Sequence, residues 1–139
     1  MPRALTWCNW MSRGCRRVLM RRASKVADER GYIVTLLGAR CRFPVNDHGH
    51  HDWAWKAGNR LIQKSAAMQM KKALVDVHEA GYRPQLAVHD EIDQSVGSPK
   101  DIIGIAKVMQ AAVTLRVPSI VDPEIGPNWG RLEKVKVAA

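Results

Sequence analysis

Apolar positions recur along the chain at regular spacings that predict helices and strands. Residues 18–30 favour a helix that ends at Gly31, because Ala, Arg, Leu and Met are good helix formers and glycine suits the position just past a helix. Residues 66–80 place apolar side chains three and four positions apart, which predicts an amphipathic helix with Ser65 as its N-cap. A shorter helical run is expected over residues 53–62.

The segment that follows Gly97 predicts a further helix from its local chemistry. Ser98 is expected to be the N-cap, Pro99 the first helical residue and Asp101 the acid that completes a capping box. Apolar side chains from residue 102 to residue 113 then continue at helical spacing. The start of this helix is therefore specified by three neighbouring residues.

Three segments predict β-structure. Residues 32–37 form a β-branched strand that a glycine turn joins to a return strand at residues 41–44, which makes a hairpin. Residues 84–96 predict a tighter hairpin with Asp90 at its tip. Residues 120–125 alternate weakly as a last strand, which an internal proline confines to a sheet edge or a bulge. Helices and strands mix without regular βαβ alternation, so we expect an α+β fold with a small antiparallel sheet of hairpins packed against two to four helices.

The composition is that of a globular protein with an excess of positive charge. With 139 residues, 46% hydrophobic and 25% charged, the chain is expected to form one compact domain. No segment approaches the roughly 20 apolar residues of a membrane span, so no membrane partner is expected. The 22 Lys and Arg exceed the 13 Asp and Glu by nine, which is typical of a nucleic-acid-binding protein or of a merely basic surface. Motifs are needed to choose between these two.

Two features bear on the cellular compartment. Cys8, Cys15 and Cys41 form no C-x-x-C pair and no even framework, which indicates neither a structural zinc site nor a disulfide scaffold and fits a reducing cytosol. The first 27 residues contain seven Lys and Arg and no acid, a pattern also found in mitochondrial transit peptides. A helix that faces nucleic acid explains the same pattern without processing, so a mitochondrial location is the less favoured alternative.

The polar segment 46–52 is expected to be a surface loop, and it contains His48, His50 and His51. Imidazole and carboxylate groups can bind a transition metal, but the spacing matches no zinc pattern. The role of this loop stays open.

Asp90 is the strongest candidate for metal chemistry. A carboxylate at a hairpin tip, with a strand on either side to fix its direction, suits Mg²⁺, which prefers hard oxygen ligands and usually takes one or two from protein. An ordinary acidic β-turn is the alternative interpretation of His-Asp-Glu between two short strands. The neighbouring motifs decide between them.

Four ordered motifs resemble the C-terminal palm region of family A DNA polymerases, with phage-type members the most similar. The resemblance covers residues 18–131, and it leaves residues 1–17 as an unmatched basic segment and residues 132–139 as a basic tail. The motifs are Gly31-Tyr32 with Thr35-Leu36-Leu37-Gly38 and Arg40, similar to G-Y-x-x-T-L-x-G-R; Asn59-Arg60-Leu61-Ile62-Gln63 with Met70-Lys71-Lys72-Ala73-Leu74; Leu86-Ala87-Val88-His89-Asp90-Glu91; and Leu115-Arg116-Val117-Pro118 with Ile125-Gly126-Pro127-Asn128-Trp129.

The resemblance implies templated nucleotidyl transfer in DNA replication, with Mg²⁺ ions, a DNA primer-template and dNTP as partners. It identifies Asp90 as a metal-bridging aspartate and Glu91 as the adjacent acid that supports the primer end or the metal shell. His89 matches a histidine near the primer terminus. A bacterial or phage-infected cytoplasm is the expected location.

The same resemblance identifies DNA-contacting residues on the preceding helix. Asn59 and Gln63 match polar residues that approach the minor-groove side of the nascent duplex, where acceptors are read without regard to sequence. Lys56 and Arg60 are further candidates for primer and template contacts. For all of these positions the alternative is a surface side chain that makes local hydrogen bonds.

Several residues depart from the family pattern. The family usually has glycine where Lys64 stands and an acid where Met68 stands, so Lys64 is expected to be strained if it needs a positive φ. Trp55 replaces a basic residue or histidine that faces the substrate, and Gly58 stands where a helix prefers leucine. Arg21 and Lys25 have the spacing of the nucleotide-binding helix, but the flanking residues match a later helix, so we interpret the pair as coincidental.

The upstream motif with the first catalytic aspartate and the nucleotide-binding helix are not matched in the 139 residues. One carboxylate cannot hold two divalent ions about 4 Å apart, so the chain is not expected to polymerise DNA alone. The leading hypothesis is a palm portion whose two-metal site is completed by a second polypeptide that carries the upstream motifs. The alternatives are a non-catalytic DNA-binding or interaction protein derived from a palm, and a decayed reading frame.

Overall fold

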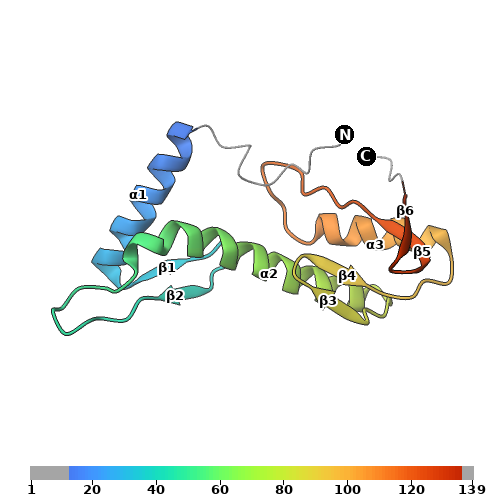
Figure 1. The fold of residues 1–139 in the computed structure, drawn as a ribbon, viewed down its shortest axis with the longest axis horizontal. Helices are drawn as coiled ribbons and strands as arrows, with labels where there is room; N and C mark the ends of the chain where they lie inside the picture. Colours follow the sequence, from blue (N-terminus) through green and yellow to red (C-terminus); the bar gives the residue numbers. More distant parts are fainter. Residues whose placement is uncertain (1–12, 136–139) are drawn as a thin grey trace. The chain divides into compact units, whose positions relative to one another are not determined.

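The computed structural model describes residues 13–135, and these fall into two compact units that divide between Ala66 and Ala67. The first twelve positions of the predicted basic segment 1–17 and the last four of the predicted tail 132–139 lie outside the described residues. The described part contains three α-helices and three separate two-stranded antiparallel sheets (Figure 1). The predicted α+β class is therefore confirmed, with three hairpins in place of one sheet.

The first unit begins with α1 (Arg13–Arg30), which ends as predicted at Gly31, a residue with a φ of 72°. The hairpin of β1 (Tyr32–Val34) and β2 (Arg40–Arg42) follows, and Gly38 has a φ of 85° in its turn. Both glycines occupy a left-handed conformation that other residues rarely adopt. The predicted hairpin is confirmed, although its strands are shorter than expected.

The core of the first unit is built mostly from small side chains. Helix α1 packs against β1 and against the 3-10 helix η2 (Ala54–Lys56). Alanines allow helix backbones to approach closely, and two larger side chains fill the remaining space. The buried members are Ala23, Ala27, Ile33, Phe43, Ala54 and Ala57.

Helix α2 (Ala57–Glu79) is one continuous helix, so the predicted break near Ser65 is wrong. The sequence around Ser65 contains no glycine or proline that would interrupt a helix. The Ser65 hydroxyl accepts a hydrogen bond from the Leu36 backbone N–H at 3.1 Å instead of capping a helix. Lys64 lies inside α2, and among the described non-glycine residues only Trp53 and His89 have a positive φ. The expected strain at Lys64 is therefore absent.

The second unit contains the end of α2, which terminates as predicted at Gly81. The Gly81 N–H donates to the His78 carbonyl at 3.0 Å and the Tyr82 N–H donates to the Val77 carbonyl at 3.2 Å. This pair of bonds is a Schellman motif, which satisfies carbonyls at the helix end. The chain then reverses toward Pro84 and the next hairpin.

Two further hairpins and a helix complete the second unit. Strands β3 (Leu86–Val88) and β4 (Glu91–Asp93) pair as predicted. Helix α3 (Pro99–Ala111) has the full capping box that the sequence predicts. The predicted strand 120–125 is placed too early, because β5 (Glu124–Asn128) begins after Pro123, and β6 (Arg131–Lys134) was not predicted at all. The buried apolar residues of this unit are Ala73, Val77, Ile105, Ala106, Ala112 and Val113.

Candidate functional site

The β3–β4 hairpin places Asp90 at its tip. Val88 pairs with Glu91, so only His89 and Asp90 lie in the loop between the strands. The predicted position of Asp90 is therefore confirmed, while its role as a metal ligand remains a prediction. A two-residue loop between paired strands has fewer conformations than a longer loop, so its direction is more firmly fixed.

His89 gives the tip an uncommon backbone conformation. Its φ is 54°, whereas Asp90 has a negative φ. Glycine is the residue that most readily adopts a positive φ, and histidine is one of the few other residues found there. The left-handed conformation of an L-residue costs about 1–2 kcal/mol. The hairpin keeps histidine here despite that cost.

The two acids of the hairpin are open to solvent. Asp90 and Glu91 are both exposed, and neither carboxylate forms a hydrogen bond or an ion pair with another described residue. Exposed carboxylates without a protein partner retain all their oxygen lone pairs for a cation. Hard oxygen donors of this kind fit Mg²⁺, which keeps several water or phosphate ligands and needs one or two carboxylates.

The base of the hairpin is held by Gln85. Its backbone N–H donates to the Asp93 carbonyl at 2.9 Å, and its side-chain oxygen accepts from the N–H and the hydroxyl of Ser95, both at 3.0 Å. These bonds join the two ends of the hairpin beyond the strands themselves. They restrict the motion of the loop that carries Asp90.

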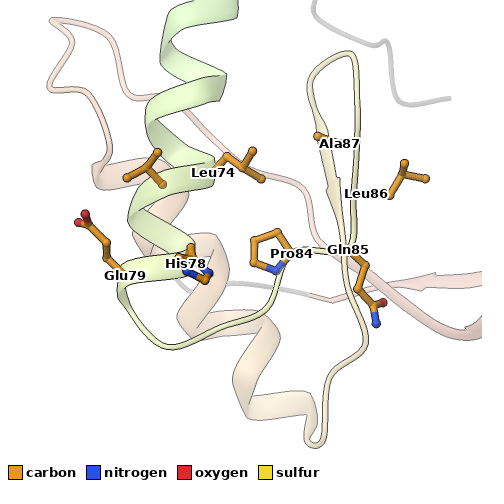
Figure 2. Close-up of a pocket in the computed structure, with 8 residues that line it drawn as sticks. Leu74, His78, Glu79, Pro84, Gln85, Leu86 and Ala87 are labelled. Atoms are coloured by element: carbon orange, nitrogen blue, oxygen red, sulfur yellow. The ribbon is translucent and has the colours of Figure 1, made fainter.

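An apolar groove lies beside the hairpin and was not predicted from the sequence. Figure 2 shows Leu74 and His78 of α2 on one side and Pro84, Gln85 and Leu86 on the other. Leu74 and His78 lie four positions apart on one helix face, but nothing in the sequence pairs that face with Pro84. The three residues of β3 are all exposed, so the hairpin presents an open apolar face.

Asn59 and Gln63 lie on one exposed face of α2 in the first unit. They are four residues apart, which places them one turn from each other, and both are exposed. The Arg60 guanidinium lies 5.0 Å from the centroid of the Phe43 ring, and the Lys56 Nζ lies 4.0 Å from the centroid of the Trp53 ring. The two amides are thus free to meet a ligand, whereas the two cations are held over aromatic rings.

The predicted site residues fall into two groups, each within its own unit. His89, Asp90 and Glu91 belong to the second unit, and Lys56, Asn59, Arg60 and Gln63 belong to the first. Charge follows the same division. Residues 1–66 contain 13 Lys and Arg against 4 Asp and Glu, and residues 67–139 contain nine of each. The entire excess of +9 therefore lies in the first unit, and a polyanion would be attracted there.

The histidine loop is organised by an asparagine. The side-chain oxygen of Asn46 accepts hydrogen bonds from the backbone N–H groups of His48 and His50. The Asn46 side-chain amide donates a hydrogen bond to the Asp52 carboxylate at 3.0 Å. His51 Nδ1 donates to the Asp28 carbonyl at 2.7 Å and so ties the loop to the end of α1. Within residues 13–135, no three His, Cys, Asp or Glu side chains gather to hold a metal ion. The three bonds of Asn46 and the bond of His51 hold the loop in shape.

None of the helices in the described part of the chain is long and apolar enough to cross a membrane. The family model for DNA polymerase family A matches residues 16–131. The chain belongs to DNA polymerase family A. The match includes both the hairpin with Asp90 and the face of α2 with Asn59 and Gln63.

Relatives in this family come from phages and bacteria. The DNA-directed DNA polymerase of Pseudomonas phage M6 is 49% identical over 100 residues, which cover 72% of this chain and 15% of the phage protein. DNA polymerase I of Geobacillus stearothermophilus is 36% identical over 118 residues, covering 74% of this chain and 13% of that protein. The 139 residues thus span less than one sixth of the length of these two relatives.

A solved structure has the same fold over most of the chain. It is the POL domain of Pol1 from M. smegmatis in complex with DNA primer-template and dNTP, with a TM-score of 0.62 and 30% identity. The match covers 76% of this chain and 21% of that chain. The α+β arrangement described above is therefore a family A polymerase fold.

One departure from the family pattern has a structural reason. A Cβ atom added to Gly58 would contact the Met20 sulfur and lie 3.1 Å from the Met20 Cα, so glycine allows α1 to approach the start of α2. Sequence reasoning missed this pair because the two residues are far apart along the chain. Trp55, the other departure in this part of the chain, is 71% exposed.

Proposed function

We propose that this chain forms the C-terminal palm portion of a family A DNA polymerase, acting in DNA replication through residues 18–131. The observation that carries the proposal is the exposed Asp90 carboxylate at the tip of a two-residue hairpin loop, inside the region that matches the family. In this role the chain contributes a metal-binding aspartate and primer-template contacts to templated nucleotidyl transfer. The relatives come from bacteria and phages, so we propose the cytoplasm of a bacterial or phage-infected cell as its location.

Three residues of the hairpin would act at the reaction centre. Asp90 offers carboxylate oxygens as Mg²⁺ ligands, and Glu91 supports the primer end or the metal shell from the neighbouring position. His89 lies beside them, near the position of the primer terminus. Mg²⁺ held by Asp90 would supply positive charge that activates the primer 3′-hydroxyl and stabilises the charge on the α-phosphate and leaving group.

Asn59 and Gln63 would hold the duplex from its minor-groove side. Their exposed amides can donate to purine N3 and pyrimidine O2, which are acceptors in every base pair. Lys56 and Arg60 would add positive charge against the phosphates of primer and template. These contacts position the duplex without reading its sequence, as a replicative reaction requires.

The metal site is completed by a second polypeptide that carries the upstream aspartate and the nucleotide-binding helix. Two divalent ions about 4 Å apart need more negative charge than one aspartate supplies. The exposed β3 strand supports the proposal, because a two-stranded hairpin is marginally stable by itself and gains from a third strand or a packed surface. In this arrangement dNTP is bound mainly by the added segment.

Complementation tests the proposal. The 139-residue chain is mixed with the polymerase of Pseudomonas phage M6 truncated before its matching region, and primer extension is measured with Mg²⁺ and dNTPs. We expect extension only in the mixture. We expect Asp90→Ala to reduce it by more than about 100-fold, because metal-assisted charge stabilisation supplies several kcal/mol.

Asp122→Ala is the matched control, because Asp122 is an exposed aspartate of the same unit outside the hairpin. It should extend primers as the unchanged chain does. If Asp90→Ala extends primers as well as Asp122→Ala does, Asp90 has no part in the reaction. If the mixture never extends primers although both chains are folded, the second-polypeptide proposal fails.

A non-catalytic DNA-binding protein is the second candidate function. It is favoured by the concentration of the whole positive excess in residues 1–66, away from the hairpin acids. Such a protein would bind duplex DNA in EDTA, with an affinity that falls steeply as salt rises. Titrations of labelled primer-template with and without Mg²⁺, combined with absence of extension in the complementation assay, would select this function.

A further inference from the structure

Two exposed tryptophans and a lysine form a cluster where η2 leads into α2, and we refer to Trp53, Trp55 and Lys56 as the indole cluster. The ring centroids of the two tryptophans are 6.3 Å apart and their planes are inclined by 45°. The Lys56 Nζ lies 4.0 Å from the Trp53 centroid and 4.8 Å from the Trp55 centroid. One cation thus faces both rings at cation–π distance.

The rings of this cluster remain in water although the unit has an apolar core beside them. Trp55 is 71% exposed and Trp53 is 48% exposed, while the intervening Ala54 is buried. Aromatic side chains gain more than most others from burial, and exposed aromatic groups mark binding surfaces. The chain therefore buries the small residue and presents both indoles.

The backbone at Trp53 is held in an unfavourable conformation. Its φ is 63° and its ψ is 13°, and it is the N-cap of η2 without a side-chain hydrogen bond to the helix. Glycine or asparagine would suit this conformation, and Ser, Thr, Asp or Asn would suit the cap. Strained residues persist where the surrounding structure holds them, often at ligand-binding positions. The Trp53 side chain forms no hydrogen bond to the helix, so we infer that the residue is kept for its exposed ring.

We propose that the indole cluster binds an unpaired nucleotide of single-stranded DNA, with its base stacked on the outer face of Trp55 and its phosphate against the Lys56 ammonium. The 45° inclination leaves no parallel slot between the indoles, and Lys56 covers their shared side, so the base stacks on one ring only. Trp53 is a positioning residue that holds Lys56 and Trp55 in place.

Charge identifies the occupant as a polyanion. Residues 1–66 carry the entire positive excess of the chain, 13 Lys and Arg against 4 acids, and the cluster lies within them. Exposed aromatic rings combined with positive charge are the arrangement by which proteins bind single strands without sequence preference. That the nucleic acid is DNA rather than RNA rests on the proposed polymerase function.

A binding titration tests this proposal. The full 139-residue chain is added to fluorescein-labelled oligo(dT) of about 20 nucleotides in EDTA, and fluorescence anisotropy measures the affinity. A second probe has the same length and phosphates but abasic sugars. Trp55→Ala should weaken binding to oligo(dT) by at least about fivefold and leave the abasic probe within twofold, because stacking needs a base. Trp129→Ala is the matched control, since Trp129 is 72% exposed in the other unit, and it should bind both probes normally.

Lys56→Gln separates charge from stacking. It should weaken both probes alike and lower the dependence of log affinity on log salt by about one, because one phosphate contact is lost. Trp53→Gly relieves the positive φ, so the variant should fold, yet it should bind oligo(dT) more weakly. Thermal melts monitored by circular dichroism confirm that each variant is folded.

Three results would overturn the proposal: equal loss on both probes with Trp55→Ala, no loss at all, or no binding of oligo(dT) by the unchanged chain at about 50 mM salt. Equal affinity for oligo(U) would assign the cluster to single-stranded nucleic acid generally and overturn the assignment to DNA. The test needs no metal and no partner polypeptide. Asp90→Ala should bind oligo(dT) normally, so a failure here is distinguishable from a failure of primer extension.

Discussion

Gly58→Ala tests the close approach of α1 to the start of α2. Alanine is favoured over glycine inside a helix by about 1 kcal/mol, so an unobstructed site would be stabilised. The added Cβ would instead contact the Met20 sulfur and lie 3.1 Å from the Met20 Cα, which is backbone and cannot rotate away. Overpacking of this kind costs about 1–3 kcal/mol. The net effect is a loss of about 1 kcal/mol, opposite in sign to the helix propensity.

Thermal unfolding of the full chain, followed by circular dichroism, measures this effect. A loss of about 1 kcal/mol lowers the Tm of a domain of this size by roughly 4 °C. Gly104→Ala is the comparison, because its Cβ would meet the hydroxyl and ring carbons of Tyr82 but no backbone atom, and that side chain can swing aside. We expect Gly104→Ala to be neutral or stabilising, by up to about 1 kcal/mol.

A double variant supplies the decisive result. Met20→Ala removes the sulfur, so Gly58→Ala should be less destabilising in that background, with a favourable coupling of about 0.5–3 kcal/mol between the two changes. A rise in Tm for Gly58→Ala alone, or strict additivity with Met20→Ala, would refute the packing reasoning and leave only the helix propensity of the site.

Three further predictions concern the second unit and are checked by the same thermal melts. Ser98→Ala removes the acceptor of the Lys100 N–H, 3.2 Å away, and should cost about 1 kcal/mol; an unchanged Tm would exclude a role for the cap. His89 has a φ of 54°, so His89→Val should lower stability by about 1–2 kcal/mol more than His89→Gly. Equal stabilities of the two variants would mean that the turn rearranges. Lys72→Ala breaks a 2.7 Å ion pair with Asp76, and the lysine side chain is half exposed. The loss of unfolding free energy should stay below about 0.5 kcal/mol and vanish in about 1 M salt. A loss of stability that persists in salt would contradict an electrostatic cause.

The elements that sequence predicted well are those specified by neighbouring residues. The start of α3 follows from Ser98, Pro99 and Asp101, which form the capping box by themselves. The ends of α1 and α2 follow from Gly31 and Gly81, because a left-handed residue after a helix favours glycine. Each of these features needs only a few residues of context.

The errors arise where a distant residue decides the outcome. Ser65 has the local character of an N-cap, but its hydroxyl accepts from Leu36, 29 residues earlier, and the helix runs through it. Gly58 violates helix preference because Met20 lies against it. Strand β6 has no buried residue, so no alternation of apolar and polar positions marks it in the sequence.

The candidate site shows the same limit. The hairpin with Asp90 is local, and its two-residue loop was predictable from the flanking apolar residues. The groove beside it joins Leu74 to Pro84 through tertiary contact, and the indole cluster owes its geometry to the positive φ of Trp53. Periodicity does not report on either feature.

The division of charge separates two properties that a polymerase needs together. Affinity for DNA comes mainly from phosphate neutralisation, and residues 1–66 hold the whole positive excess. The carboxylates proposed to bind metal, Asp90 and Glu91, lie in a unit with no net charge, where no excess of cations competes with Mg²⁺ for them. Loss of Asp90 should therefore abolish extension and spare DNA binding, whereas loss of charge from residues 1–66 should weaken DNA binding first. DNA binding alone consequently says nothing about catalysis, and only the response of primer extension to Asp90 separates the two proposed functions.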